Sequence, residues 1–169
     1  MTTNTQRAMQ SILAALMVLG IGMVTAHAQA TSTLTINATV SSRAELTLSP
    51  TTISFLDASP TSTPSIPANT TVAVTANVRS SGTPTLKVLA NGDLTSGSDT
   101  IAIGNVQWTA SGAPFIAGTM NKTTAQDAAT FSVGTSGSYS GTFSYTLANS
   151  WNYKVGSYSA TATYTLTAP

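Results

Sequence analysis

Period-two alternation over the last fourteen residues is the feature that most constrains the fold of this chain. In residues 156–169 (GSYSATATYTLTAP), one face carries Tyr158, Tyr164 and Leu166 with small alanines between them, and the other carries only Ser and Thr. Successive Cβ atoms of a β-strand point to opposite sides of a sheet, so the pattern predicts a strand with one buried face. We expect this strand to close the fold. Ala160 and Ala162 on its apolar face suggest that another strand packs closely over it.

Similar alternation recurs along the chain and predicts further strands. The clearest segments are residues 33–40, 71–79, 85–90 and 141–147, and shorter ones are 44–48, 53–56, 101–108 and 131–133. Three prolines mark 58–67 as a loop or a shielded edge, and Asn91-Gly92 is a typical hairpin turn. No helix is expected after residue 30. We predict an antiparallel, immunoglobulin-like β-sandwich of about eight strands in one domain, residues 31–169. A small sheet closed on itself is the alternative architecture.

The first thirty residues have the composition of a secretory signal peptide. Arg7 gives a weakly positive start, residues 12–24 are an apolar run of thirteen, and residues 26–30 (AHAQA) offer two small-x-small cleavage sites. A membrane-spanning helix needs about 20 apolar residues, and this run is shorter. We expect cleavage after Ala28 or Ala30, export to an extracellular, cell-surface or fimbrial location, and no membrane span after cleavage. An uncleaved N-terminal anchor is the alternative.

The mature chain is expected to carry no net charge. The whole sequence has a formal charge of +1, and Arg7 accounts for it, because five basic residues balance five acidic ones from Thr31 onward. Without a basic patch there is no electrostatic footprint for nucleic acid, so no nucleic-acid partner is expected. The chain has no cysteine, so an exported domain of this size has to rely on its core rather than on disulfides.

Residue types that carry chemistry are nearly absent after residue 30. The single histidine, His27, lies in the expected signal peptide, cysteine is missing, and Glu45 is the only glutamate of the mature chain. A Ser–His–Asp or Cys–His arrangement and a His/Cys metal site therefore cannot be assembled. The loop at 91–99 (NGDLTSGSD) has oxygen-bearing side chains at alternate positions, but it departs from a calcium loop, and Asx turns in a hairpin explain it more simply. We predict no catalytic, metal-binding or cofactor-binding residues and no enzymatic activity.

Aromatic residues are the remaining candidates for ligand binding. Trp151 and Tyr153 lie in the connector between the last two expected strands, where an aromatic pair could stack on a sugar ring. They are our candidate contacts for a cell-wall or extracellular glycan. Packing in the core or at a sheet edge is the alternative role for both residues.

The alternating segment after the expected cleavage site has two possible partners. Leu34, Ile36, Ala38 and Val40 share one face of residues 33–40. In strand addition, an extended segment joins the edge of another sheet, with main-chain hydrogen bonds for affinity and alternate side chains in pockets. Residues 33–40 are therefore the candidate assembly strand of a homopolymer, or of a polymer with other surface subunits. The alternative is an ordinary first strand within its own domain.

Three stretches are similar to one family of surface proteins. LTINATVSSRAELTLSP at 34–50, TLKVLANGDLTSGSDTIAIGNVQW at 85–108 and GSYSATATYTL at 156–166 resemble strands of cysteine-free fimbrial major subunits of the colonisation-factor type. This resemblance implies a pilin-like subunit whose mature chain opens with a donor strand.

The C-terminus is also similar to WxL-type cell-surface domains. These end with a Gly-x-Tyr turn, a W-x-L motif six residues after the tyrosine, and Ala-Pro. The same layout is present in Tyr158, Tyr164-Thr-Leu166 and Ala168-Pro169, with tyrosine in place of tryptophan, whereas Trp108-Thr-Ala110 only approximates the earlier W-x-L position. Both resemblances imply extracellular display without catalysis. We expect a structural, pilin-like or surface-adhesion subunit, with a monomeric glycan-binding module as the alternative.

Overall fold

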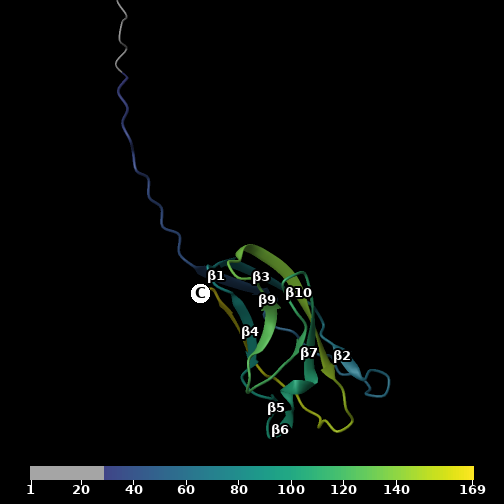
Figure 1. Ribbon diagram of the computed structural model, residues 1–169. Helices are drawn as coiled ribbons and strands as arrows, with labels where there is room; N and C mark the ends of the chain where they lie inside the picture. The colour runs from purple at the N-terminus through teal and green to yellow at the C-terminus, as the bar shows by residue number, and fades with distance from the viewer. Residues whose placement is uncertain (1–28) are drawn as a thin grey trace, which may run out of the picture. The chain divides into compact units, whose positions relative to one another are not determined.

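The computed structural model describes residues 29–169, which are all-β with antiparallel pairing between strands. Its contacts divide the chain into two units, Met1–Ala38 and Thr39–Pro169. In the first unit, the described residues 29–38 form neither strand nor helix. The strands of the described chain all belong to the second unit (Figure 1). The predicted signal peptide lies outside the described residues, apart from its last two positions.

The larger sheet of the second unit is built around one long strand. Its order is β1–β3–β10–β7–β8, and β2 also pairs with β10. The long strand β10 lies along β3 with its first part, along β7 with its second part, and along β2 at its end. The strands are β1 (Arg43–Ser49), β2 (Ser65–Pro67), β3 (Val72–Arg79), β7 (Val106–Ser111), β8 (Gly118–Thr119) and β10 (Ser136–Ala148).

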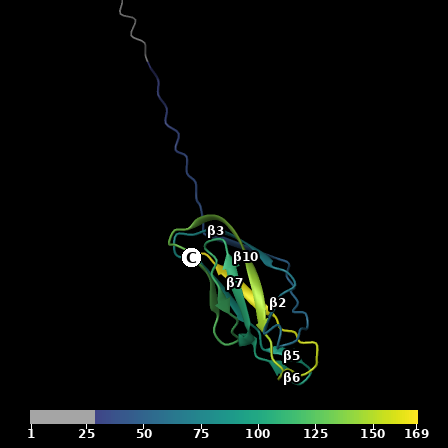
Figure 2. The ribbon, with the colours of Figure 1, turned by 90° about the vertical axis from the view of Figure 1, so that its right-hand side faces the viewer.

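A smaller sheet faces the first, and a short hairpin lies at one end of the unit (Figures 1 and 2). The smaller sheet has the order β11–β4–β9, and the hairpin is formed by β5 and β6. A single 3-10 turn, η1, precedes β7. These elements are β4 (Thr85–Ala90), β5 (Leu94–Ser96), β6 (Asp99–Ile101), η1 (Ile103–Asn105), β9 (Gln126–Thr130) and β11 (Ala162–Thr167).

One hydrophobic core is shared by the inward faces of the two sheets. On β3, the valines at 72, 74 and 78 alternate with exposed or half-buried residues, as the period-two pattern predicts. On β4, Leu86, Val88 and Ala90 are at most 1% exposed. Between them lie Trp108 from β7 and Phe143 from β10, which are among the largest fully buried side chains. Thr and Ser fill many of the outward positions, for example at 163, 165 and 167 on β11, and few of these positions are charged.

Several predicted elements differ from the structure. The described residues form eleven strands rather than about eight, because four of them contain only two or three residues. The segment at 53–56 forms only an isolated bridge between Phe55 and Ala68. The predicted hairpin at Asn91-Gly92 is wrong, since β4 pairs with β9 and β11 and not with β5. The tight turn comes later, between Ser96 and Asp99, where Gly97 has φ +58.

Candidate assembly site

The apolar face of residues 33–40 has no partner among the described strands. This segment carries no strand, although its alternation predicts one. Leu34, Ile36 and Val40 are 84%, 83% and 68% exposed, and Ala38 is exposed as well. Large apolar side chains on one face of an extended segment are a surface that strand addition can bury.

The inward face of β1 is incompletely covered. Ala44, Leu46 and Leu48 lie opposite the buried Val78, Ala76 and Val74 of β3, so they point to the core side of the sheet. Their β3 neighbours are at most 5% exposed, whereas all three β1 residues are only half-buried. Since β1 pairs with β3 alone, its other side is a free sheet edge within the described chain.

The inward face of β11 is incompletely covered in the same way. Ala162, Tyr164 and Leu166 lie opposite Ala90, Val88 and Leu86 of β4, whose side chains are fully buried. Tyr164 and Leu166 are half-buried, and Ala162 is exposed. Ala160, which precedes the strand, is also exposed. The prediction that Ala160 and Ala162 are buried is therefore wrong, because no described part of the chain lies over them.

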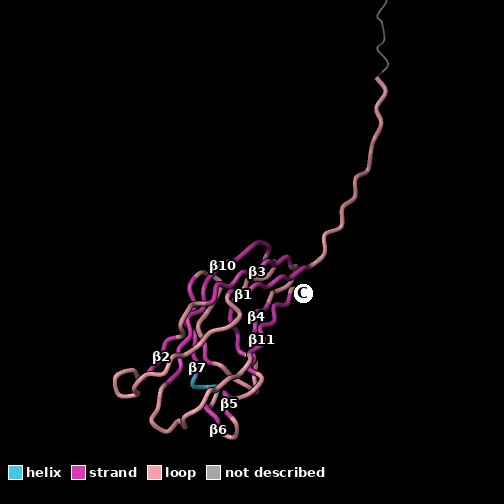
Figure 3. Tube along the Cα trace, turned by 180° about the vertical axis from the view of Figure 1, so that it is seen from behind, coloured by secondary structure: helices cyan, strands magenta, loops and turns pink. Residues whose placement is uncertain are grey.

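These two edges form one feature, which we call the open seam: Ala44, Leu46 and Leu48 of β1 with Ala162, Tyr164 and Leu166 of β11. The two strands are neighbours, but no β-ladder joins them in the described chain (Figure 3). A hydrogen bond links them at one end, where Ser42 Oγ, just before β1, donates to the Pro169 carbonyl at 3.0 Å. The same carbonyl also accepts from Ser80 Oγ, just after β3, at 2.6 Å. Elsewhere each strand has an unpaired backbone edge, and its inward apolar side chains are only partly covered.

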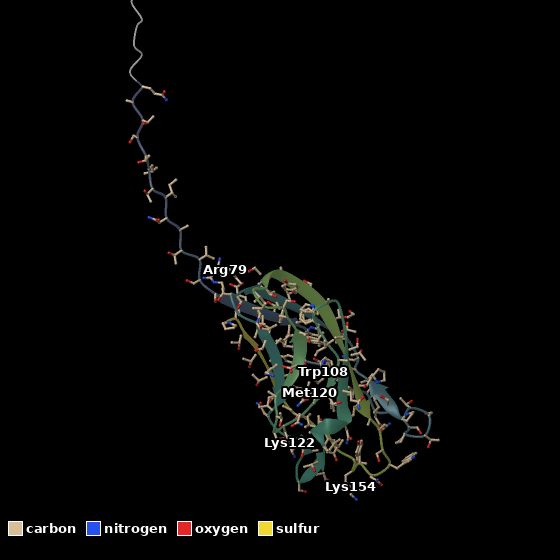
Figure 4. The ribbon with its side chains drawn as sticks, viewed as in Figure 1. Arg79, Trp108, Met120, Lys122 and Lys154 are labelled. Carbon is tan, nitrogen blue, oxygen red and sulfur yellow. The ribbon has the colours of Figure 1, made fainter. Side chains whose placement is uncertain are left out.

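The opposite side of the two sheets is closed. There the segment after β7 crosses to β9, and Ile116 N donates to Ala128 O at 3.0 Å while Thr130 N donates to Pro114 O at 2.9 Å. Trp108 fills the space beneath, with its Nε1 donating to Ile116 O at 2.9 Å, and Figure 4 places it beside Met120 in the interior. The contrast indicates that the open seam is a local feature and not a general looseness of the fold.

The floor of the open seam is aromatic and uncharged. Tyr164 stacks on Phe143, and its hydroxyl meets that of Tyr145 at 2.6 Å. Burial raises the pKa of both tyrosines, so both hydroxyls stay neutral. The charged residues of β1, Arg43 and Glu45, point to the outward face. An apolar strand could enter such a seam without burying an ionised group.

The two glycan candidates are not equivalent. Trp151 is 74% exposed, and its Nε1 donates to Thr61 Oγ1 at 3.3 Å, which leaves the ring open to solvent. Tyr153 is half-buried, and its hydroxyl donates to Ala148 O and accepts from Asn105 Nδ2. The structure therefore does not present the two rings as an exposed pair.

The loop that carries Trp151 is held by a neighbouring loop. Asn149 Nδ2 donates to Ala58 O at 2.9 Å and to Thr63 O at 3.0 Å, and Asn149 N donates to Pro64 O. Sequence reasoning did not identify Asn149, because its partners lie more than eighty residues away along the chain.

The acidic loop at 91–99 uses its first carboxylate internally. Asp93 Oδ1 accepts from Ile103 N at 3.0 Å, and Asp93 Oδ2 pairs with Lys122 Nζ. The Lys122 ammonium and the Ile103 amide hold the pKa of Asp93 below its usual value. Both oxygens thus have protein partners, and no group of three or more His, Cys, Asp or Glu side chains within residues 29–169 is arranged to hold a metal ion.

No protein-family model and no curated protein matches this chain. Among residues 29–169 no helix has the length and apolar character needed to cross a membrane. The site is therefore defined by its geometry alone.

Proposed function

We propose that the protein is an exported, non-enzymatic structural subunit that assembles by β-strand complementation. In this proposal residues 1–30 are removed as a signal peptide, and the two sheets form an immunoglobulin-like β-sandwich that lacks one strand. Residues 33–40 of one copy, or of a related subunit, fill the open seam of the next. The subunit would then belong to a pilin-like or fimbrial fibre, as the resemblance to fimbrial subunits implies.

The observation that carries the proposal is the match between two incomplete surfaces. One is an extended segment whose apolar residues at 34, 36, 38 and 40 are all exposed. The other is a pair of neighbouring strand edges whose inward apolar residues are only half-buried or exposed. A strand laid between β1 and β11 would pair with both edges and place its apolar face over Leu46 and Tyr164.

Hydrophobic burial and backbone pairing both favour this assembly. Fully burying a Val, Leu or Ile side chain contributes about 1.5–3 kcal/mol, and the segment offers three such side chains, Leu34, Ile36 and Val40. Free edges also invite pairing with other chains, and proteins usually block them with charges, bulges or prolines. On β1 and β11 the charges are confined to the start of β1, and β11 consists of Ala, Thr, Tyr and Leu.

A test is the assembly state of the mature chain, residues 31–169, measured by light scattering and electron microscopy. The parent chain should form multimers in which residues 33–40 resist proteolysis. Ile36→Asp should leave monomers, because it would place a charge in the apolar seam. Thr35→Asp is the matched control on the opposite face and should still assemble. Equal assembly of the Ile36→Asp and Thr35→Asp chains would contradict the proposal, as would a parent chain that stays monomeric with residues 33–40 open to protease.

Glycan binding by a monomeric surface module is the second candidate, and the exposure of Trp151 favours it. A tryptophan ring that is open to solvent on a loop fixed by Asn149 is a preorganised surface for stacking on a sugar ring. Thr61 adds a hydroxyl beside it. The resemblance to WxL-type domains agrees with this function.

Retention on peptidoglycan and on polysaccharide columns tests the second candidate. Trp151→Ala should abolish retention without a loss of stability. Tyr153→Phe should leave retention unchanged, because it removes only a hydroxyl that is already hydrogen-bonded within the domain. If the parent chain is not retained on any of these materials, glycan binding is rejected. That result would leave strand complementation untouched.

A further inference from the structure

We infer that the connection between residues 33–40 and β1 prevents this segment from entering the open seam of its own chain. The connection is only two residues long, Ser41-Ser42, since β1 begins at Arg43. The inference rests on the proposed function and identifies the partner: the seam has to be filled by another copy. Three independent features carry it, namely strand register, turn chemistry and the hydrogen bonds of the connection.

Register is the first obstacle to folding back. A two-residue turn at Ser41-Ser42 would set Val40 opposite Arg43, Ala38 opposite Glu45 and Ile36 opposite Thr47. Residues directly opposite each other share one face of a sheet, and Arg43, Glu45 and Thr47 lie on the exposed outward face. The fold-back would therefore turn the apolar residues toward water.

The same register would place polar residues in the seam. Thr39, Asn37 and Thr35 would lie opposite Ala44, Leu46 and Leu48, on the core side. A one-residue slip reverses every side chain of a strand, so a fold-back needs a turn of odd length to recover the apolar face. A strand from a second copy has no such constraint, because no turn links it to β1.

Turn chemistry is the second obstacle. Two-residue hairpins favour residues with positive φ, such as Asn-Gly, and three-residue hairpins place a residue, usually Gly, in the left-handed region. Residues 39–43 (TVSSR) contain neither Gly nor Asn. Within residues 29–169 only glycines have positive φ. The residues present therefore favour neither a two-residue turn nor a three-residue turn.

The third obstacle is a set of hydrogen bonds that hold the connection in place. Arg79 Nε donates to Ser41 O at 2.7 Å, and Ser42 Oγ donates to Pro169 O at 3.0 Å. Figure 4 places Arg79 at the end of the domain where β1 begins. A strand that folded back from Ser42 would have to enter the seam at the end where the first bond holds the connection against β3 and the second joins it to the chain after β11.

The test compares two variants of the mature chain. The first, Ser41→Asn with Ser42→Gly, improves the turn but keeps the unfavourable register, and it should polymerise like the parent. The second inserts a Gly/Ser linker of about six residues after Ser42 and includes Arg79→Ala, which releases the register and the turn and removes the hydrogen bond from Arg79 to Ser41 O. A tethered strand has an effective concentration of about millimolar, so at micromolar protein the second variant should be mainly monomeric. Its residues 33–40 should resist proteolysis.

Controls separate this inference from the proposed function. Adding Ile36→Asp to the linker variant should restore protease sensitivity of residues 33–40, which shows that the protection came from the inserted strand. A linker variant that polymerises as well as the parent overturns the inference and leaves strand complementation intact. A parent chain that is monomeric with residues 33–40 protected overturns the inference, because it would already be self-complemented. A parent chain that is monomeric with residues 33–40 cleaved contradicts the proposed function itself.

Discussion

Tyr145 of β10 and Tyr164 of β11 meet hydroxyl to hydroxyl at 2.6 Å, and this contact joins the two sheets beneath the open seam. Tyr145 is 5% exposed, and Tyr164 stacks on Phe143 with ring centroids 5.8 Å apart. A buried hydroxyl destabilises the fold unless it has a hydrogen-bond partner, and each of these two hydroxyls provides that partner for the other. The pair therefore links β11 of the smaller sheet to β10 of the larger sheet.

Tyr164→Phe should destabilise the domain by about 1–3 kcal/mol, because Tyr145 would keep a buried hydroxyl without its partner. The variant Tyr145→Phe should cost a similar amount. The double variant should cost less than the sum of the two, since it removes both hydroxyls together. Urea unfolding in the monomeric Ile36→Asp background measures each step. Tyr158→Phe, which loses a more exposed hydrogen bond to Lys154 O, is the control and should have a smaller effect.

The same pair predicts loss of stability in alkali. Burial raises the pKa of both tyrosines above the ordinary value of 10.0, so the folded state holds these protons more tightly than the unfolded state. Their contribution is fully present below that value and is lost as the pH rises through the folded pKa. The urea midpoint should therefore fall between about pH 9 and about pH 11. The double Phe variant should show a smaller fall, and an equal fall in both chains would contradict the prediction.

Gly118→Ala should destabilise the closed side by about 1–3 kcal/mol, through overpacking. A Cβ at this position would collide with the ring of Trp108, which is 2% exposed and fixed by its hydrogen bond to Ile116 O. Gly92→Ala is the matched control, because no heavy atom lies within 4 Å of its added Cβ. The measurement is again the urea midpoint, and equal midpoints for the two variants would show that the ring can move aside.

Asp93→Asn should make the domain less sensitive to acid. The Lys122 ammonium and the Ile103 amide lower the pKa of Asp93 from 3.8, so its contribution to stability is present above that value and is lost as the pH falls through the folded pKa. Unfolding midpoints at about pH 7 and about pH 3 should differ less in Asp93→Asn than in the parent. Lys122→Gln should reduce the difference in the same direction, and an unchanged difference in both variants would contradict this account.

Alternation in the sequence predicted the strands but not their partners. β3 and β4 lie where period two placed them, because a side chain's face is recorded locally in the order of the residues. Which strand lies beside another depends on contacts between distant segments, so the hairpin at Asn91-Gly92 was wrongly predicted. The apolar face of β11 was recognised because alternation is local. Its incomplete burial at Ala162 and Tyr164 was not, because burial depends on distant segments.

The glycan candidates illustrate the same limit on a smaller scale. Trp151 and Tyr153 are two residues apart, and their sequence context does not distinguish them. Their exposure differs because Asn105, 48 residues earlier, donates to the Tyr153 hydroxyl and helps hold that ring against the domain. The candidate assembly residues were predicted from alternation alone, whereas the seam that would receive them required the positions of β1 and β11.

Mixing two complementary variants should yield a dimer and nothing larger. Ile36→Asp disables the inserted strand but keeps the open seam, and Leu166→Asp places a charge in the seam but keeps the strand. Each chain alone should be monomeric. In an equimolar mixture, the strand of the Leu166→Asp chain can enter the seam of the Ile36→Asp chain, and growth then stops at both ends.

Native mass spectrometry and light scattering distinguish this outcome from the alternatives. Thr165→Asp, at the outward neighbour of Leu166, is the control and should polymerise like the parent, because its side chain faces solvent. Circular dichroism checks that each variant keeps its β content. If the mixture remains monomeric, or if Leu166→Asp alone polymerises normally, then residues 33–40 do not enter the seam between β1 and β11.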